Sequence, residues 1–148
     1  MLTTIKALAI TTALLGAAVI PAAAADFEVR LLQDKATGAL VFEPMVTKVA
    51  VGDTVTFVPT QKGHNVEAIK DMLPATAKTF KGAAGERLAV TFTEPGTYGV
   101  KCTPFAGAGM VGLVVVGADP VDPNAVDGTH LPHRAIQGLR TAVEYAAR

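Results

Sequence analysis

The sequence YGVKCTPFAGAGM, residues 98–110, contains the single cysteine of the chain, Cys102, and ends on Met110. Alternating apolar segments precede and follow it, which predicts a short connection between two strands. Because strand side chains alternate between two faces, Cys102 shares the apolar face of Tyr98 and Val100 at the end of the first strand. A thiolate and a thioether on such a connection are soft donors, and they suit copper.

A histidine lies upstream in the sequence KGHNVE, residues 62–67. The imidazole of His64 is a third kind of donor that copper accepts. Taken singly, a histidine in a turn is usually solvated, and a methionine beside a buried strand is usually core. Gly63 and Gly109 stand next to His64 and Met110 and allow close backbone approach there, so the joint placement favours one shared site.

These two segments resemble the small blue copper proteins, the cupredoxins, and pseudoazurins in particular. The resemblance runs from Asp26 to Gly117 and implies a Greek-key β-sandwich with one copper ion per chain that cycles between Cu(I) and Cu(II). It implies that the chain is a one-electron carrier and not an enzyme. Cys102 then supplies the strong thiolate ligand, His64 the buried imidazole and Met110 the weak axial thioether. Asn65 matches the family residue that steadies the thiolate and ties the two ligand loops together.

Phe105 departs from the pattern of this family, in which the loop reads Cys, two residues, His, four residues, Met. A phenyl ring cannot coordinate copper. If the ring fills the gap, His64, Cys102 and Met110 form a three-coordinate site that suits Cu(I) and disfavours Cu(II). If the small residues of the loop leave room, water or an outside ligand completes a looser redox site. The alternatives to electron transfer are therefore a Cu(I)-binding or trafficking cupredoxin and a metal-free cupredoxin scaffold.

Residues 1–25 have the pattern of a signal peptide. Lys6 is followed by an apolar run from Ala7 to Ile20, and small residues before Asp26 predict cleavage after Ala25. The run is shorter than the roughly 18–20 apolar residues that span a bilayer. We therefore expect export to the periplasm and no membrane span in the mature protein.

Cys102 cannot form a disulfide within an exported chain that has one cysteine, so it is an inert buried thiol, an intermolecular link or a metal ligand. The loop around it favours the ligand. His64 and Cys102 could pair as base and nucleophile, but no orienting carboxylate is evident and the thiol is expected to be shielded. His130 and His133 are weak candidates to replace the missing ligand, because the tail would have to fold back over the loop and Pro132 breaks a helix that would align them.

The composition of the mature chain indicates one near-neutral domain. Removing 25 of 148 residues leaves 123, with 12 basic and 13 acidic residues. Such a balance argues against nucleic acid as a partner. Lys62 and Lys101 lie near the candidate site, and the resemblance implies docking on periplasmic redox proteins such as a nitrite reductase or a cytochrome. We expect a monomer.

Alternating short segments between Asp26 and Gly117 predict an all-β sandwich, and this range is the expected cupredoxin domain. The run Val111–Val116 is apolar throughout, which predicts a strand buried on both faces. Residues 69–85 lack a pattern, and we expect a long surface loop. Residues 118–148 are expected to form a linker and an amphipathic helix that packs on the sandwich rather than binding a partner or a membrane surface.

Overall fold

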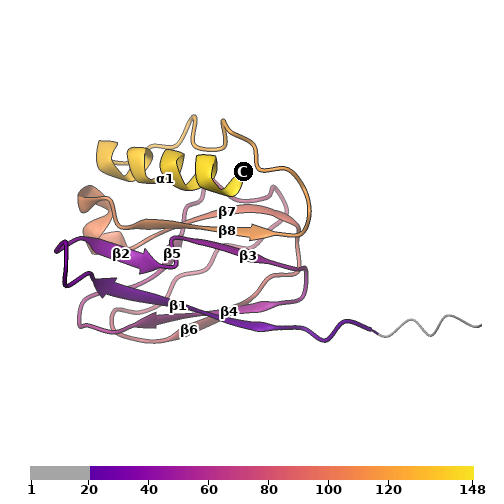
Figure 1. Cartoon of the computed structure of the whole chain (residues 1–148), viewed down its shortest axis with the longest axis horizontal. Coiled ribbons are helices and arrows are strands. Elements are labelled where there is room, and N and C mark those ends of the chain that lie inside the picture. The colour runs from indigo at the N-terminus through magenta and orange to yellow at the C-terminus, as the bar shows by residue number, and fades with distance from the viewer. Residues whose placement is uncertain (1–20) are drawn as a thin grey trace, which may run out of the picture.

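The structure is a computed structural model that describes residues 21–148, and it is a sandwich of two four-stranded sheets (Figure 1). One sheet has the strand order β2-β1-β4-β6 and the other β3-β8-β7-β5. The predicted all-β sandwich with a C-terminal helix is thereby confirmed. The elements are β1 (Asp26–Gln33), β2 (Leu40–Glu43), β3 (Val46–Val49), β4 (Thr54–Pro59), β5 (Glu67–Ala68), β6 (Leu88–Thr91), β7 (Gly96–Lys101), the 3-10 helix η1 (Thr103–Ala108), β8 (Val111–Val116) and α1 (His133–Ala146).

The main core lies between the two sheets and follows from the alternation in the strands. In β1, Val29 and Leu31 are buried, and Val55 and Phe57 are buried in the neighbouring β4, with exposed or half-buried residues between them. The strands β1 and β4 run parallel and bring Val29 opposite Phe57. One apolar face of each sheet is thus removed from water, which is the main favourable term in forming the sandwich.

Strand β8 is buried at every position, as its apolar run predicts. Val114 and Val116 belong to the core between the sheets, whereas Val111, Leu113 and Val115 belong to a second apolar cluster on the outer face. A strand covered on both faces does not need polar residues at alternate positions. The second cluster is where the C-terminal helix packs.

Helix α1 covers the outer face of the sheet that contains β7 and β8 (Figure 1). Its buried residues include Leu139 and Val143, which lie on one side of the helix at i and i+4. The helix begins directly after Pro132, whose backbone is extended. Pro132 therefore lies between His130, which is outside the helix, and His133, its first residue, and no helix aligns the two histidines, as the sequence predicts.

The expectation of a surface loop over residues 69–85 is wrong in part. Ile69 and Met72 are buried in the cluster under α1, and the backbone of this segment bonds to β7 from Ile69 N–H to Gly99 O at 2.8 Å and from Gly99 N–H to Met72 O at 2.9 Å. Gly99 permits the approach, because a Cβ there would lie 2.6 Å from Met72 Sδ. An anchor that depends on a glycine in a distant strand leaves no periodic signal within the segment itself.

The predicted signal peptide lies mostly outside the described residues. Residues 21–25 are exposed, and the Ala25 N–H donates to the buried carboxylate of Asp53 at 2.8 Å. Within residues 21–148, none of the helices has the length and apolar character needed to cross a bilayer. Cleavage after Ala25 and the division into ranges 26–117 and 118–148 stay predictions.

Candidate metal centre

Strand β7 and strand β8 place Cys102 and Met110 at one end of the sandwich. Cys102 directly follows β7 and Met110 directly precedes β8, with η1 between them. The Cys102 N–H donates to Met110 O at 3.0 Å, and the Met110 N–H donates to Phe105 O at 3.2 Å. Both side chains have an exposed fraction of 0%. The loop is closed on itself by backbone hydrogen bonds, so the two sulfur donors are held by rigid elements.

His64 reaches the same point from the turn between β4 and β5. Its Nδ1 atom lies 3.9 Å from Cys102 Sγ, and its side chain is only 3% exposed. Gly63 precedes it with a φ of +88°, a conformation that favours glycine, and a Cβ there would meet nothing within 4 Å. The expected reason for Gly63, close backbone approach, is therefore wrong, and its positive φ is what the turn requires.

Gly109 does show the close approach that the sequence predicts beside Met110. Its φ is also +88°, and a Cβ on it would lie 3.3 Å from the backbone oxygen of Arg134 in α1. The start of α1 thus packs directly on the loop between the two sulfur donors. Sequence analysis did not identify this contact, because it joins elements that are separated in the chain by strand β8.

The donor set fits a soft first-row metal ion. Metal bonds of about 2.0 Å to nitrogen and about 2.3 Å to sulfur that meet at a tetrahedral or trigonal angle separate the two donor atoms by roughly 3.5–3.7 Å. The 3.9 Å between His64 Nδ1 and Cys102 Sγ is close to that separation. Together with the buried thioether sulfur of Met110, these atoms offer the mixture of nitrogen, thiolate and thioether that copper prefers.

Burial sets the protonation of the two stronger donors. It lowers the pKa of His64, which keeps the imidazole neutral and leaves a nitrogen lone pair for a metal. It raises the pKa of the Cys102 thiol, and hydrogen bonds from the backbone of Asn65 and Phe105 offset part of that rise. At neutral pH the metal-free site therefore holds a thiol, and binding a metal as thiolate releases its proton.

Asn65 ties the histidine loop to the cysteine loop. Its Oδ1 accepts a hydrogen bond from the Thr103 N–H at 2.8 Å, and its Nδ2 donates to Gly82 O and to Thr103 Oγ1, each at 3.3 Å. Its backbone also bonds to the sulfur of Cys102. The structure thus gives Asn65 the contacts that the resemblance implies.

Thr103 extends this network to the surface through residues that the sequence did not single out. Its Oγ1 donates to the Glu67 carboxylate at 2.5 Å, and Lys81 Nζ lies 3.6 Å from the same carboxylate. The Thr103 hydroxyl lowers the pKa of Glu67, with burial opposing it and Lys101 and Lys81 adding to it. Nothing in the sequence around Thr103 or around Glu67 indicates that the two side chains interact.

Phe105 lies against the histidine. The centroids of the Phe105 and His64 rings are 5.2 Å apart, with 49° between the ring planes. The Phe105 side chain is half-buried and packs on the same core cluster as Cys102 and Met110. An apolar ring therefore occupies the immediate surroundings of His64, on the outer side of the two buried sulfur atoms.

Comparisons with known proteins agree with this geometry. The sequence profile of the plastocyanin/azurin family, described as copper binding proteins, matches residues 29–117. The chain belongs to the plastocyanin/azurin family. It is 48% identical over 128 residues to the pseudoazurin of Paracoccus pantotrophus. The aligned region covers 86% of this chain and 88% of that protein. The family assignment confirms the predicted class, a copper-binding electron carrier of the pseudoazurin type.

Solved pseudoazurins have the same fold as this chain. The Hyphomicrobium denitrificans pseudoazurin matches with a TM-score of 0.75 and 32% identity, over 83% of this chain and 99% of that one. The Methylobacterium extorquens AM1 pseudoazurin matches with a TM-score of 0.73 and 35% identity, over 81% and 98%. The matches cover nearly the full length of both solved chains, so the likeness extends over the whole sandwich.

His130 and His133, the weak candidates to replace the missing ligand, do not join the buried side chains of His64, Cys102 and Met110. The tail does fold back over the loop, since Arg134 contacts Gly109, but His130 and His133 are both exposed. The His130 imidazole instead faces the Asp71 carboxylate, with Nδ1 and Oδ2 3.9 Å apart. Catalysis by a His64–Cys102 pair is also disfavoured, because the sulfur is fully buried and the other nitrogen of His64 faces the amide of Gln61 rather than a carboxylate.

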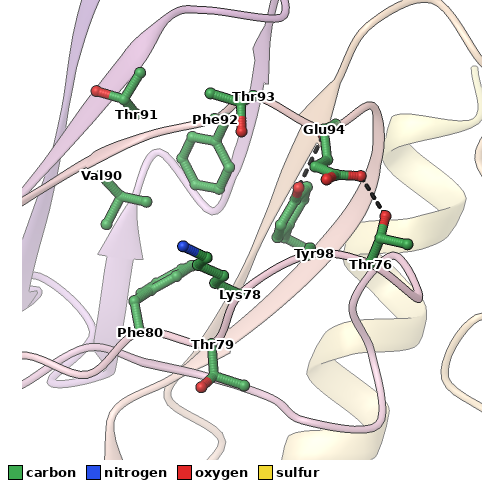
Figure 2. A pocket seen from close by; sticks show the side chains of 11 residues that line it. Thr76, Lys78, Thr79, Phe80, Val90, Thr91, Phe92, Thr93, Glu94 and Tyr98 are labelled. Carbon is green, nitrogen blue, oxygen red and sulfur yellow. Dashed lines mark hydrogen bonds between the residues drawn. The ribbon is translucent and has the colours of Figure 1, made fainter.

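A separate cavity of about 240 Å³ lies beside the aromatic end of the core (Figure 2). Phe80, Phe92 and Tyr98 line it, and the Tyr98 hydroxyl donates to the backbone oxygen of Glu94 at 2.8 Å. The Thr76 hydroxyl donates to the Glu94 carboxylate at its rim. None of the three candidate copper ligands lines this cavity, so it is distinct from the metal centre.

Proposed function

We propose that this chain is a periplasmic electron carrier that holds one copper ion through His64, Cys102 and Met110. The observation that carries the proposal is the convergence of His64 Nδ1 on Cys102 Sγ at 3.9 Å, with both sulfur side chains fully buried. Copper bound by an imidazole, a thiolate and a thioether supplies a one-electron couple. The residues of this chain supply the rigid and dry surroundings.

Rigidity comes from hydrogen bonds that fix each donor. The Cys102 N–H binds Met110 O, and Asn65 holds Thr103, the residue after the cysteine. A site that moves little between Cu(I) and Cu(II) exchanges electrons with little reorganisation, which is what an electron carrier requires.

A second candidate function is Cu(I) binding or trafficking without redox cycling. The contact between the Phe105 and His64 rings favours it, because an apolar ring in this place excludes water and adds no donor. A site of three soft donors stabilises Cu(I) relative to Cu(II). The third alternative, a metal-free scaffold, is an outcome of the same experiment.

Export and partners belong to this proposal as well. A signal peptide over residues 1–25 would carry the chain to the periplasm, where a nitrite reductase or a cytochrome is the expected redox partner. Lys62 is exposed on the histidine turn and Lys101 is half-exposed at the end of β7, so both can contribute to docking on an acidic surface. Electrostatic docking of this kind slows as the salt concentration rises.

An anaerobic titration of the mature protein with Cu(II) tests these functions. A visible thiolate-to-copper charge-transfer band that bleaches on reduction and returns on reoxidation supports electron transfer. No band, together with tight Cu(I) binding in a competition assay, supports the Cu(I) carrier. Failure to bind either ion contradicts both and leaves the scaffold.

Phe105→His is expected to convert the site into a full blue copper centre. The substitution adds an imidazole beside His64 and the two sulfur donors. Losing only the hydrogen-bond partner of a ligating residue costs roughly 10- to 100-fold in metal affinity, so gaining a ligand should raise Cu(II) affinity by at least that factor. The measurement is the same titration. Ala108→His is the matched control, since it places an imidazole at an exposed position of the same η1. A Phe105→His protein that binds no copper would contradict the placement of the other three ligands.

A further inference from the structure

We infer that Gln61 is a positioning residue that fixes the tautomer and the orientation of His64. The inference rests on the proposed copper site, and it deepens it. The His64 Nε2 atom lies 3.4 Å from Gln61 Oε1, on the side of the imidazole away from Cys102. Gln61 is an exposed residue of the turn that leads to His64, and nothing in its sequence context marks it for such a role.

The amide of Gln61 has a defined orientation. Its Oε1 accepts a hydrogen bond from the backbone N–H of Gln33, at the end of β1, at 2.9 Å. A backbone N–H needs an acceptor, so the oxygen and not the NH₂ group faces Gln33. The same oxygen faces His64, so one amide connects the imidazole to the end of strand β1.

This orientation determines which nitrogen of His64 carries the proton. A carbonyl oxygen can only accept, so a hydrogen bond from His64 to Gln61 needs the proton on Nε2. In the neutral ring the lone pair is then on Nδ1, the atom that lies 3.9 Å from Cys102 Sγ. The donor nitrogen is thus prepared for a metal before any metal arrives.

The tautomer matters more here because Phe105 supplies no nitrogen. Among residues 21–148 the other two histidines, His130 and His133, are exposed and outside the buried donors. His64 is therefore the nitrogen donor on which the site depends. The opposite tautomer would direct an N–H at the metal position and remove the only strong neutral donor.

The experiment measures the tautomer of His64 directly in the metal-free protein by two-bond ¹H–¹⁵N NMR. The wild type should show one neutral tautomer, protonated at Nε2. Gln61→Leu removes the acceptor and should give a mixture of both tautomers, whereas Gln61→Glu keeps an acceptor and should retain Nε2–H. Gln33→Leu is the matched control, because the hydrogen bond to Gln61 comes from the backbone of Gln33 and its side-chain amide donates to Gly38 O instead, and it should leave the tautomer unchanged.

Cu(I) affinity of the same four proteins is the second readout. Gln61→Leu should lose roughly 10- to 100-fold, the usual cost of removing the partner of a ligating histidine, and Gln61→Glu and Gln33→Leu should stay within a few-fold of the wild type. A wild-type His64 protonated at Nδ1 overturns the inference, and so does an unchanged tautomer in Gln61→Leu. If the wild type binds no copper, the proposed function fails, while the tautomer in the metal-free protein still decides the role of Gln61.

Discussion

Phe105 gives this site its particular chemistry. At a position where the family resemblance implies an imidazole, which both donates to metals and carries a proton, it places a ring that does neither. Its ring centroid lies 5.2 Å from that of His64, and Cys102 and Met110, in the core cluster on which Phe105 packs, are fully buried. A dry set of soft donors stabilises bound Cu(I) relative to Cu(II). Phe105 is therefore the side chain on which the choice between the two proposed functions, electron transfer and Cu(I) binding, depends.

Glu67 is the side chain whose ionisation supports the two ligand loops. The Thr103 hydroxyl holds its pKa below the ordinary value of 4.5. A depressed carboxyl pKa stabilises the folded state above the pKa of the unfolded chain, and that contribution is lost as the pH falls through the lower, folded pKa. The contribution is therefore present at neutral pH and disappears in the acid range below about pH 4.5.

Glu67→Gln should consequently be less stable than the wild type at pH 7, with the difference shrinking below pH 4.5 as the wild-type carboxylate is protonated. Urea unfolding at a series of pH values measures the free energy of unfolding for both proteins. Glu144→Gln, which changes an exposed carboxylate on α1, is the matched control for the substitution itself. A Glu67→Gln difference that grows toward acid pH would contradict the assignment.

Among the elements, the 3-10 helix η1 is the one that connects the two candidate sulfur ligands, Cys102 and Met110. It is a single 3-10 segment that ends at Gly109, where the backbone enters the left-handed region at a φ of +88° and a ψ of 18°. The Gly109 N–H bonds back to Ala106 O and Phe105 O, which closes the segment directly before Met110. The start of α1 then packs against this closure through Arg134. The position of Met110, the candidate thioether ligand, thus depends on a glycine and on a helix from the end of the chain.

Gly109→Ala should destabilise the fold by about 1–2 kcal/mol, because a side chain in the left-handed conformation is strained and its Cβ would press on the backbone of Arg134. Gly107→Ala is the matched control within η1, since a Cβ there meets nothing within 4 Å, and it should be neutral or slightly stabilising. Thermal and urea unfolding measure both. Equal stability of the two variants would show that the closure at Gly109 is not what holds the loop.

The protein has two apolar clusters joined by one sheet. The cluster between the sheets contains the two candidate sulfur ligands, Cys102 and Met110, and the outer cluster holds α1 against the same strand β8. Because Val114 and Val115 are neighbours in β8 but belong to different clusters, the two should unfold together. The helix is therefore part of the cooperative unit rather than an appendage.

Leu139→Ala tests this cooperativity. Leu139 is fully buried in the outer cluster, and truncating it should lower the free energy of unfolding by about 2–5 kcal/mol. Far-UV circular dichroism and the aromatic NMR signals of Phe92 and Tyr98, which lie in the other cluster, should report the same midpoint in urea. Gln137→Ala, on the exposed side of the helix, should stay within about 0.5 kcal/mol. Separate midpoints for helix and core would contradict a single unit.

The sequence by itself was enough to predict the sandwich and the three candidate ligands. The sandwich depends on apolar alternation in the strands and on the all-apolar run of β8. The three candidate ligands depend on soft donors in two short segments and on the resemblance of these segments to the cupredoxins. Helix α1 was equally predictable, because one of its faces repeats apolar residues at helical spacing. Such patterns are local, so they can be recognised in the sequence without knowledge of the tertiary contacts.

Only the tertiary structure showed how the ligands are held. The contact of Gln61 with His64, the link from Thr103 to Glu67, the anchored segment around Met72 and the support of Gly109 by Arg134 all bring together residues whose types are common in turns and loops. Their roles come from distance in space, and sequence spacing does not encode that distance. The types and spacing of the candidate donors are therefore set by the sequence, and their orientation in the structure by the packing of separate elements.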